Sequence, residues 1–284
     1  MQALLRIGRR LADATTSWNP GDLEWWIASA DPSIDWSERI TLWSDPSTPD
    51  RTVGWSWWTP PDELDWFVDP RIDSAELRTS LLEVLDRSQN TIWATASHAS
   101  LTEFLRRRGY EGEGDGYIDL ARRLDADDEA RMQVQLPDGF VVRSVDLPAD
   151  LDERVRVHRA AFAPSKMTVE KHQRVASMPS YRLDLDLVCV AADGTFASFC
   201  IVWFDAETGT VEFEPVGTDP AFARRGLASA VMTEGMRRAA GLGATLALVT
   251  SPDGEKGARG TALYRSLGFR QVREFVPFKR KLAA

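Results

Sequence analysis

Two segments of this sequence repeat the same order of elements: a strand, the dipeptide Asp-Pro, a loop and a long helix. The first is WFVDPRIDSAELRTSLLEVL, around Asp69, and the second is EPVGTDPAFARRGLASAVMTEGM, around Asp219. A further pair, FLRRRGYEGEGDGYIDL and LYRSLGFRQVREFVPFK, closes a helix on a glycine and an aromatic residue, at Gly109 and Gly268. Because both pairs occur in the same order, the sequence predicts two diverged copies of one fold unit.

The most polar stretch, residues 122–140, separates the two copies. We therefore predict a first domain at residues 1–124, a linker at 125–138 and a second domain at 139–284. In the second copy, two helical segments precede a hairpin that turns at Asp193-Gly194, and strand, helix, strand and helix follow. This order predicts an α/β fold of the α+β kind, with a mixed sheet.

Composition and charge exclude several classes of partner. The 284 residues carry a net charge of −9. A negative chain is not attracted to phosphate backbones or anionic lipids, so we expect no nucleic-acid and no membrane partner. No apolar run approaches the roughly 20 residues of a membrane span. The N-terminal stretch MQALLRIGRRLADATTSW is typical of an amphipathic helix rather than of a signal peptide.

Cysteines and histidines are few. Cys189 and Cys200 do not suffice for a disulfide framework, which predicts a cytoplasmic protein. His98, His158 and His172 are scattered without the spacing of metal ligands, so we predict no metal site. We interpret His158 as a packed or surface side chain of a helix.

The stretch GTDPAFARRGLASAV has the features of an anion site. A strand runs into a loop, and a helix begins near Gly226, where backbone N–H groups lack partners within the helix and the helix dipole attracts negative charge. Gly226 lets a ligand approach the backbone, and Arg224 and Arg225 add positive charge. Taken alone, the stretch fits an ordinary loop equally well. The G-x-G-x-x-G spacing of a dinucleotide fold is absent.

Together with TALYRSLGF about 30 residues later, the stretch VEFEPVGTDPAFARRGLASAVM resembles the GNAT acyltransferase superfamily, whose members bind acetyl-coenzyme A. The resemblance covers residues 139–284 and, in eroded form, about 20–124. It implies two tandem GNAT-like domains, each a mostly antiparallel sheet with a central splayed strand pair flanked by helices. In the pyrophosphate motif, Ala223 replaces the usual Gln or Arg. The resemblance implies cofactor contacts at Val216, Thr218, Arg224, Arg225, Gly226, Leu227, Ala228 and Ser229.

The resemblance also implies an acetyl-CoA-dependent N-acetyltransferase that needs no metal. Glu212 falls where the family often places its general base, and Glu214 is the neighbour that could replace it. Tyr264 matches the tyrosine that protonates the departing thiolate in many members, while Ala258 stands where an asparagine often contacts the cofactor. Alternatively, Glu212 and Glu214 are solvated carboxylates of a strand, and Tyr264 is an aromatic side chain packed on the core. If Glu212 and Tyr264 are inert, the protein is a non-catalytic acetyl-CoA sensor or interaction module. A third interpretation is an unrelated protein that binds a phosphate ester.

We expect the acyl acceptor to be an amine of a small molecule or a peptide, which the sequence does not identify further. The resemblance places the turn AFAPSKM beside the acceptor pocket, so Phe162 and Met167 are candidate lining residues. Four carboxylates could favour a cationic amine as acceptor, or could simply form a solvated acidic face: Asp184, Asp186, Asp205 and Glu207. Ten of the eleven tryptophans lie in residues 1–93. We interpret Trp25, Trp55, Trp57 and Trp66 as core or seam residues rather than as an aromatic ligand groove.

The first copy lacks the residues that would bind the cofactor. Alignment on the Asp-Pro landmark sets Glu76 against Gly226, and alignment on the second landmark sets Leu105 against Tyr264. A carboxylate beside a diphosphate is repelled, so we predict that this copy does not bind acetyl-CoA and supports the second. A homodimer is compatible with the sequence, which specifies no oligomeric state.

Overall fold

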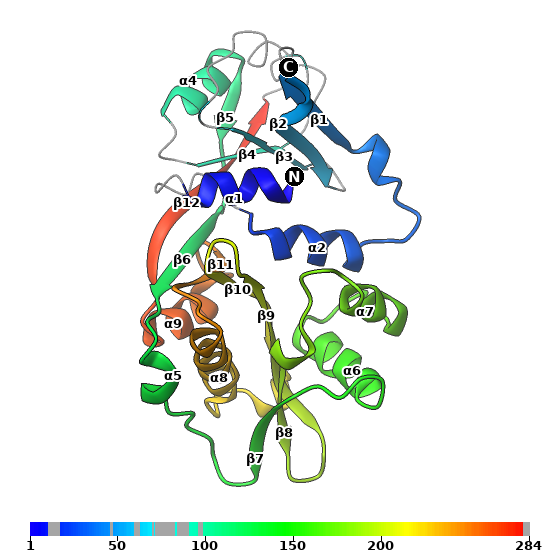
Figure 1. The fold of residues 1–284 in the computed structure, drawn as a ribbon, viewed down its shortest axis with the longest axis vertical. Helices are drawn as coiled ribbons and strands as arrows, with labels where there is room; N and C mark the ends of the chain where they lie inside the picture. Colours follow the sequence, from blue (N-terminus) through cyan, green and yellow to red (C-terminus); the bar gives the residue numbers. More distant parts are fainter. Residues whose placement is uncertain are drawn as a thin grey trace.

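The computed structural model confirms the mixed α/β fold. It describes residues 1–10, 18–45, 48–59, 63–69, 71, 83, 91–95 and 99–280. Within these residues twelve strands form one sheet, in the order β1-β2-β3-β4-β12-β6-β11-β10-β9-β8-β7, with β5 paired to β12 (Figure 1). No helix in the described part of the chain has the length and apolar character needed to span a membrane.

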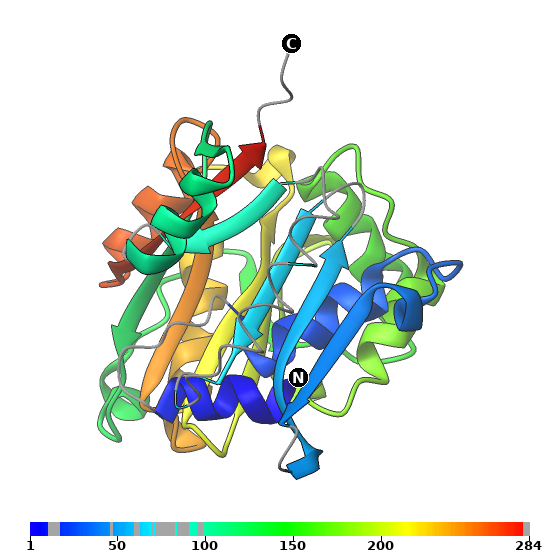
Figure 2. The ribbon, with the colours of Figure 1, turned by 90° about the horizontal axis from the view of Figure 1, so that it is seen from above.

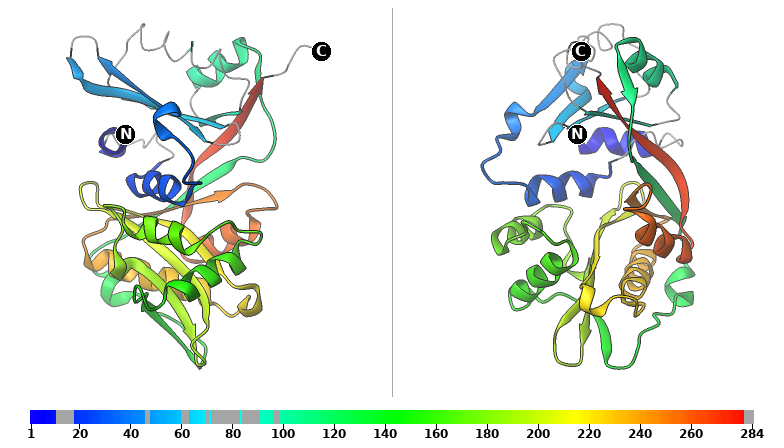
Figure 3. Two further views of the ribbon diagram at one scale, coloured as in Figure 1. Left: turned by 90° about the vertical axis from the view of Figure 1, so that its right-hand side faces the viewer. Right: turned by 180° about the vertical axis from the view of Figure 1, so that it is seen from behind.

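The second half is a sheet covered by helices on both faces. In Figures 1 and 3, α6 and α7 lie on one side of the strands, and α8 and α9 on the other. Neighbouring strands are antiparallel except for the parallel pair β10 and β11. The elements of this half are α5 (Asp128–Arg131), β7 (Phe140–Ser144), α6 (Leu151–Ala161), α7 (Val169–Ala176), η2 (Leu183–Leu185), β8 (Asp186–Ala191), β9 (Phe196–Asp205), β10 (Thr210–Thr218), η3 (Pro220–Phe222), α8 (Leu227–Gly241), β11 (Leu246–Pro252), α9 (Ala258–Ser266) and β12 (Arg270–Arg280).

The two covered faces explain the nearly continuous apolar sequence of β9. Successive side chains of a strand point to opposite faces. Ile201 and Trp203 pack in the cluster with α6 and α7, whereas Cys200 and Val202 pack in the cluster with α8. A strand with one wet face would instead alternate apolar and polar residues.

The first half begins with two helices that lie across its strands (Figure 2). Trp55 and Trp57 are completely buried and pack with Leu4 and Leu5 of α1, which confirms the predicted core role of these tryptophans. Trp25 packs with residues of the second half, as predicted for the seam. The elements are α1 (Gln2–Arg10), α2 (Pro20–Ser29), η1 (Trp36–Glu38), β1 (Ile40–Asp45), β2 (Thr48–Thr59), β3 (Glu63–Val68), β4 (Thr91–Thr95), α4 (Ala99–Arg107), β5 (Tyr110–Gly112) and β6 (Tyr117–Arg123).

The two halves exchange strands. Strand β6 of the first half pairs with β11 on one side and β12 on the other, and β12 continues into pairing with β4 and β5. Both strands run from one half of the molecule to the other in Figure 1. The sheet is therefore continuous, so backbone hydrogen bonds join the halves in addition to side-chain packing.

The second pair of sequence landmarks occupies equivalent positions. Helix α4 ends before Gly109 and α9 before Gly268, and both glycines have a positive φ, of 80° and 88°. This left-handed conformation commonly ends helices and favours glycine. The helix predicted after Asp69, with Glu76, lies outside the described residues. The domain boundaries stay predictions; the predicted linker contains α5, whose Glu129 lies 3.9 Å from Arg237 of α8.

Candidate active site

The central strand pair of the second half separates, as the resemblance implied. Strands β10 and β11 pair only where Thr210–Glu212 meets Leu246–Leu248, although both strands continue beyond these residues. Past Glu212, the edge of β10 that faces β11 therefore has no backbone partner there. Such an opening exposes main-chain donors and acceptors to a ligand.

A bulge lies at the point of separation. The register to β9 passes from Phe213 opposite Val202 to Val216 opposite Cys200, so β10 contains one extra residue. The Trp203 indole donates a 2.6 Å hydrogen bond to the Glu214 carbonyl oxygen, which satisfies a group that the irregular ladder would leave without a partner. The bulge thus changes the direction of β10 where its carboxylates occur.

A cavity of about 390 Å³ opens beside this bulge, between the two halves. Both halves of the chain line the cavity. The first half contributes residues of α2, β3 and β6 and of the segments beside them, and the second half contributes the rest. Its lining residues are Trp18, Asp22, Trp26, Glu63, Asp65, Tyr117, Phe162, Glu212, Glu214, Val216, Thr250, Ser251, Pro252, Lys256, Gly257, Gly260, Tyr264 and Phe275. The structure therefore brings the predicted Glu212, Glu214 and Tyr264 to one site.

Glu212 is held by a helix of the first half. Its side chain is only 2% exposed, and the Asn19 amide donates a 2.6 Å hydrogen bond to Glu212 Oε2. Asn19 caps α2, and its backbone N–H donates to Asp22 Oδ2 at 3.0 Å. In a cap of this kind the side chain of the third helical residue points back toward the helix start. That residue is Asp22, and its carboxyl group shares a hydrogen bond with Glu212.

Close packing holds this helix against the second half. A Cβ added to Gly21 would lie 2.3 Å from Trp203 Cβ, so only glycine allows α2 to approach β9 this closely. The capping sequence Asn19-Pro20-Gly21-Asp22 therefore combines a helix start, a contact surface and a carboxylate.

Burial sets the charge of the two strand carboxyls. Burial, followed by the neighbouring Asp22 carboxylate, raises the pKa of Glu212 well above its usual value. Two adjacent buried carboxyls retain a shared proton, because both cannot ionise at close range. Burial, and then Asp22, also raises the pKa of Glu214 to about 8. Glu214 is half-buried and faces the cavity, so it can exchange a proton with a molecule bound there.

Tyr264 lines the same cavity from α9. It is 9% exposed and packs against Phe269, with ring centroids 6.3 Å apart. Burial, followed by the charge of Glu214, raises its pKa. The phenol therefore keeps its proton and can donate it in a hydrogen bond.

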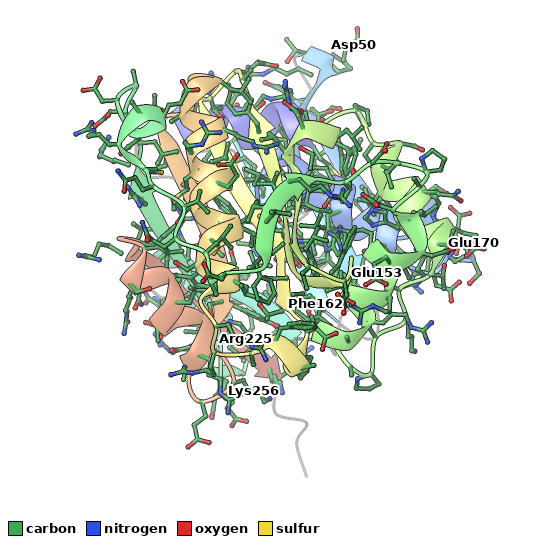
Figure 4. All side chains as sticks on the ribbon, turned by 90° about the horizontal axis from the view of Figure 1, so that it is seen from below. Asp50, Glu153, Phe162, Glu170, Arg225 and Lys256 are labelled. Carbon is green, nitrogen blue, oxygen red and sulfur yellow. The ribbon has the colours of Figure 1, made fainter. Side chains whose placement is uncertain are left out.

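The predicted phosphate loop starts α8. Gly226 is the N-cap residue, with φ of 79° and open space around its Cα, and Arg224 also has a positive φ, of 65°. Both arginines are exposed, and within the described ranges neither has an ion-pair partner; Arg225 lies over the Phe222 ring at 5.5 Å. Figure 4 labels Arg225 on the face of the molecule seen from below. The exposed helix start, the open glycine and the two cations fit the diphosphate of coenzyme A.

The other predicted cofactor residues lie on the same two elements. Val216 lines the cavity, and Thr218 at the end of β10 has its hydroxyl 2.9 Å from that of Ser198. Leu227 is buried under the sheet, whereas Ala228 and Ser229 are half-buried in the first turn of α8. In the first turn of α8, the backbone N–H groups are therefore the main contact available to a ligand, beside the exposed side chains of Arg224 and Arg225.

The acceptor residues have different positions. Phe162 is 44% exposed and lines the cavity. Met167 is 6% exposed, packs in the core with Trp25 and Val175, and is not among the residues that line the cavity. This placement does not support a role for Met167 in binding an acceptor.

The acidic residues first considered for a cationic acceptor bind arginines elsewhere. Asp186 is completely buried, 2.9 Å from Arg154, and Asp205 lies 2.9 Å from Arg6. Asp184 pairs with Arg182, and Glu207 pairs with Arg6. None of the four lines the cavity.

The two histidines that the structure describes, His158 and His172, are packed inside the protein. His158 is packed among rings, with centroids 5.0 Å from Phe162 and 5.6 Å from Phe199, and burial lowers its pKa to about 3. His172 is buried 3.4 Å from Asp186. His98 lies outside the described residues. Leu105, aligned with Tyr264, is completely buried in the core of the first half.

Sequence reasoning missed the residues that the first half adds to this site. Asn19, Asp22, Glu63, Asp65 and Tyr117 lie far from β10 along the chain. The pattern Asn-Pro-Gly-Asp indicates a helix start, but nothing local indicates that this start meets Glu212.

Comparisons with known proteins agree with this geometry. Residues 156–269 match the model of the acetyltransferase (GNAT) family. The curated mycothiol acetyltransferase of Kineococcus radiotolerans is 30% identical over 154 residues, 52% of this chain and 49% of that protein. The match thus spans about half the length of this curated relative.

Solved structures share the complete fold. A GCN5-related N-acetyltransferase from Sphaerobacter thermophilus has a TM-score of 0.66 at 18% identity, over 97% of this chain and 90% of its own. A tandem GNAT protein from the clavulanic acid biosynthesis pathway has a TM-score of 0.66 at 13% identity, over 100% and 95%. At these identities the likeness shows a fold of two tandem GNAT-like units.

Proposed function

We propose that this chain, whose residues 156–269 match the model of the GNAT acetyltransferase family, transfers an acetyl group from acetyl-CoA to an amine. The observation that carries the proposal is the convergence of Glu214 and Tyr264 on one cavity, beside the opening between β10 and β11. The α8 loop from Arg224 to Ser229 would hold the diphosphate, and the free edge of β10 near Val216 and Thr218 would bind the pantetheine arm. Acetyl-CoA supplies the activated acetyl group when it is bound.

Glu214 is our candidate for the general base. An alkyl ammonium has a pKa near 10.4, and an ordinary glutamic acid one near 4.3. Proton transfer to an ordinary glutamate would therefore cost about 8 kcal/mol, because each pKa unit corresponds to about 1.36 kcal/mol. With the pKa of Glu214 raised to about 8, the cost falls to about 3 kcal/mol. Glu212, which is buried and bonded to Asn19 and Asp22, holds its proton and positions the strand.

Tyr264 is our candidate for the general acid. A thiolate leaving group needs a proton, or a hydrogen bond, as it departs. Because burial keeps the phenol protonated, Tyr264 can supply one at neutral pH. In one acyl transfer, Glu214 then accepts a proton from the amine, and Tyr264 donates to the departing thiolate.

The test is a screen for acetyl-CoA-dependent thiol release across small amines, aminoglycosides, amino acids and peptide N-termini. We expect release with at least one amine, and a loss of about 10²–10⁴-fold in Tyr264→Phe and Glu214→Gln. Tyr110→Phe removes a hydroxyl from the core of the first half and serves as the matched control. Acetyl-CoA binding without release for any amine would favour the non-catalytic sensor instead.

A further inference from the structure

We infer that the acceptor is a small amine whose far end is a flat aromatic group, and that Trp26 of the first half and Phe162 of the second bind this group by ring contacts. We call these two residues the ring site. The inference rests on the proposed function, since it places the reacting nitrogen beside Glu214 and Tyr264 and assigns the rest of the acceptor to the rings of the same cavity.

Every exposed aromatic ring of the described residues lines this cavity. These rings are Trp26, Tyr117 and Phe162, which are 45%, 40% and 44% exposed. The other large apolar side chains that are exposed in the described ranges are aliphatic, and none is among the lining residues: Leu42, Val141, Leu183, Leu242 and Val272. Single exposed apolar side chains are common on proteins, but exposed apolar side chains that gather at one cavity mark a binding site. The selective gathering of rings indicates a ligand that itself carries a ring.

Packed rings support Phe162 in the second half. Phe162 caps the end of α6, where its backbone N–H donates a 3.1 Å hydrogen bond to the His158 carbonyl oxygen. Its ring centroid lies 5.0 Å from that of His158 and 6.2 Å from that of Phe199, which is completely buried. A Cβ added to Gly217 of β10 would lie 2.6 Å from the Phe199 ring, so glycine lets these rings approach the central strand. Phe162 is thus supported by buried rings and still exposed at the cavity.

A second group of rings supports Trp26 in the first half. The Trp18 and Trp26 ring centroids are 6.4 Å apart in an edge-on arrangement, and Trp18 lies 5.0 Å from Trp57, which is completely buried. Trp18 and Trp26 line the cavity, whereas Trp57 belongs to the core of the first half. Rings at such separations attract each other beyond the effect of burial. Each half therefore presents an exposed ring that is anchored to its own core.

The proposed cofactor contacts do not account for the ring that the first half contributes. Val216, Thr218 and the loop 224–229 all belong to the second half, whereas Trp26 lies on α2. Glu214 and Tyr264, which would act on the amine and on the thiolate, line the same cavity as Trp26. An acceptor with its nitrogen beside Glu214 can therefore reach Trp26 without leaving the cavity.

The size of the cavity and the geometry of ring contacts limit the class of acceptor. The volume of about 390 Å³ lies at the lower end of the range for small-molecule sites, which is about 300–1,000 Å³. An amine with one aromatic ring or two fused rings fits this volume, whereas a folded protein surface does not enter it. Aromatic rings prefer offset stacking or edge-to-face contacts with one another, so a flat ring gains more at this site than an aliphatic group of equal area.

Three ethylamines that differ only in the group on the second carbon test the inference: 2-phenylethylamine, 2-cyclohexylethylamine and (2-aminoethyl)trimethylammonium. Their affinities are measured by calorimetry, with and without coenzyme A. Burial alone would favour the cyclohexyl amine, because its apolar surface is at least as large, and a site for cations would favour the trimethylammonium compound. We expect the phenyl amine to bind roughly threefold to tenfold more tightly than the cyclohexyl amine, and the trimethylammonium compound to bind most weakly.

Variants identify the two residues. Trp26→Leu and Phe162→Leu keep an apolar side chain but remove the ring, so each should reduce the preference for phenyl over cyclohexyl at least twofold. Both side chains are exposed, and we expect both variants to fold. Phe104→Leu is the matched control, because Phe104 is a half-buried ring of α4 that is not among the lining residues of the cavity. This control should keep the wild-type preference.

The outcomes separate this inference from the proposed function. Equal affinity for the phenyl and cyclohexyl amines, tighter binding of the trimethylammonium compound, no binding of the phenyl amine, or a preference unchanged in either variant would overturn the ring site. Thiol release from acetyl-CoA is then measured with each amine. A phenyl preference in binding without any release would keep the ring site and remove the transferase. Release at equal kcat/KM for the phenyl and cyclohexyl amines would keep the transferase and remove the ring site.

Discussion

Asn19 donates a 2.6 Å hydrogen bond to Glu212, which lies 193 residues further along the chain. This bond joins the first turn of α2 in one half to the central strand of the other. The first half, expected only to shape and support the second, therefore also places a carboxylate, Asp22, next to Glu212, and the charge of Asp22 acts on the candidate general base, Glu214. Its own failure to bind acetyl-CoA stays a prediction, since Glu76 lies outside the described residues.

The acid limb of the pH–rate profile should depend on Asp22. Burial raises the pKa of Glu214 most, and the charge of Asp22 raises it further, so Asp22→Asn should lower that pKa and shift the acid limb to lower pH. The wild-type limb should lie near pH 8, where Glu214 loses its proton. The exposed Glu38→Gln serves as control, and kcat/KM against pH is the measurement. An unchanged limb in Asp22→Asn would show that Asp22 does not act on the base.

Cofactor binding should fail when a carboxylate occupies the start of α8. Gly226→Glu places negative charge and bulk against the diphosphate, and we expect acetyl-CoA affinity to fall at least tenfold in calorimetry. Gly114→Glu is the matched control, because Gly114 has a similar φ, of 86°, and equally open surroundings between β5 and β6 of the first half. Equal affinity in the two variants would remove the site assignment.

Stability should fall as pH rises, through Glu214. Its folded-state pKa of about 8 lies above the value of 4.5 for an unperturbed side chain, so the folded protein binds the proton more tightly between these values. The contribution is therefore complete below about pH 4.5 and is lost as pH rises to about 8. The slope is at most about 1.4 kcal/mol per pH unit, reduced by solvent contact at this half-buried group.

Urea unfolding from pH 5 to pH 8 measures this effect. Glu214→Gln cannot ionise, so the variant should gain stability relative to wild type as pH increases. Glu38→Gln should keep the wild-type slope. If wild type and Glu214→Gln run parallel, Glu214 has an ordinary pKa, and the proposed advantage in proton transfer disappears.

The second half should not fold without β6. A fragment of residues 139–284 lacks the strand that lies between β11 and β12, so both would expose unpaired edges. A fragment of residues 117–284 keeps β6 and should be more soluble and more cooperative in thermal unfolding. Comparable solubility and unfolding of the two fragments would mean that the β6 ladder contributes little.

The sequence by itself determined the repeat, the mixed α/β class and the helices and strands of the second half, and it made Glu212, Glu214, Tyr264 and the Gly226 loop candidates through the resemblance to the GNAT family. These features depend on local order: side-chain periodicity, a glycine at a helix start, and carboxylates two apart on a strand. Only the tertiary structure decided that Met167 is core, that β6 and β12 are exchanged, that Asn19 bonds to Glu212, and that Asp22, Glu63 and Asp65 line one cavity with Glu214. Contacts between distant segments depend on how surfaces pack, and a carboxylate acquires a raised pKa only when folding buries it beside another.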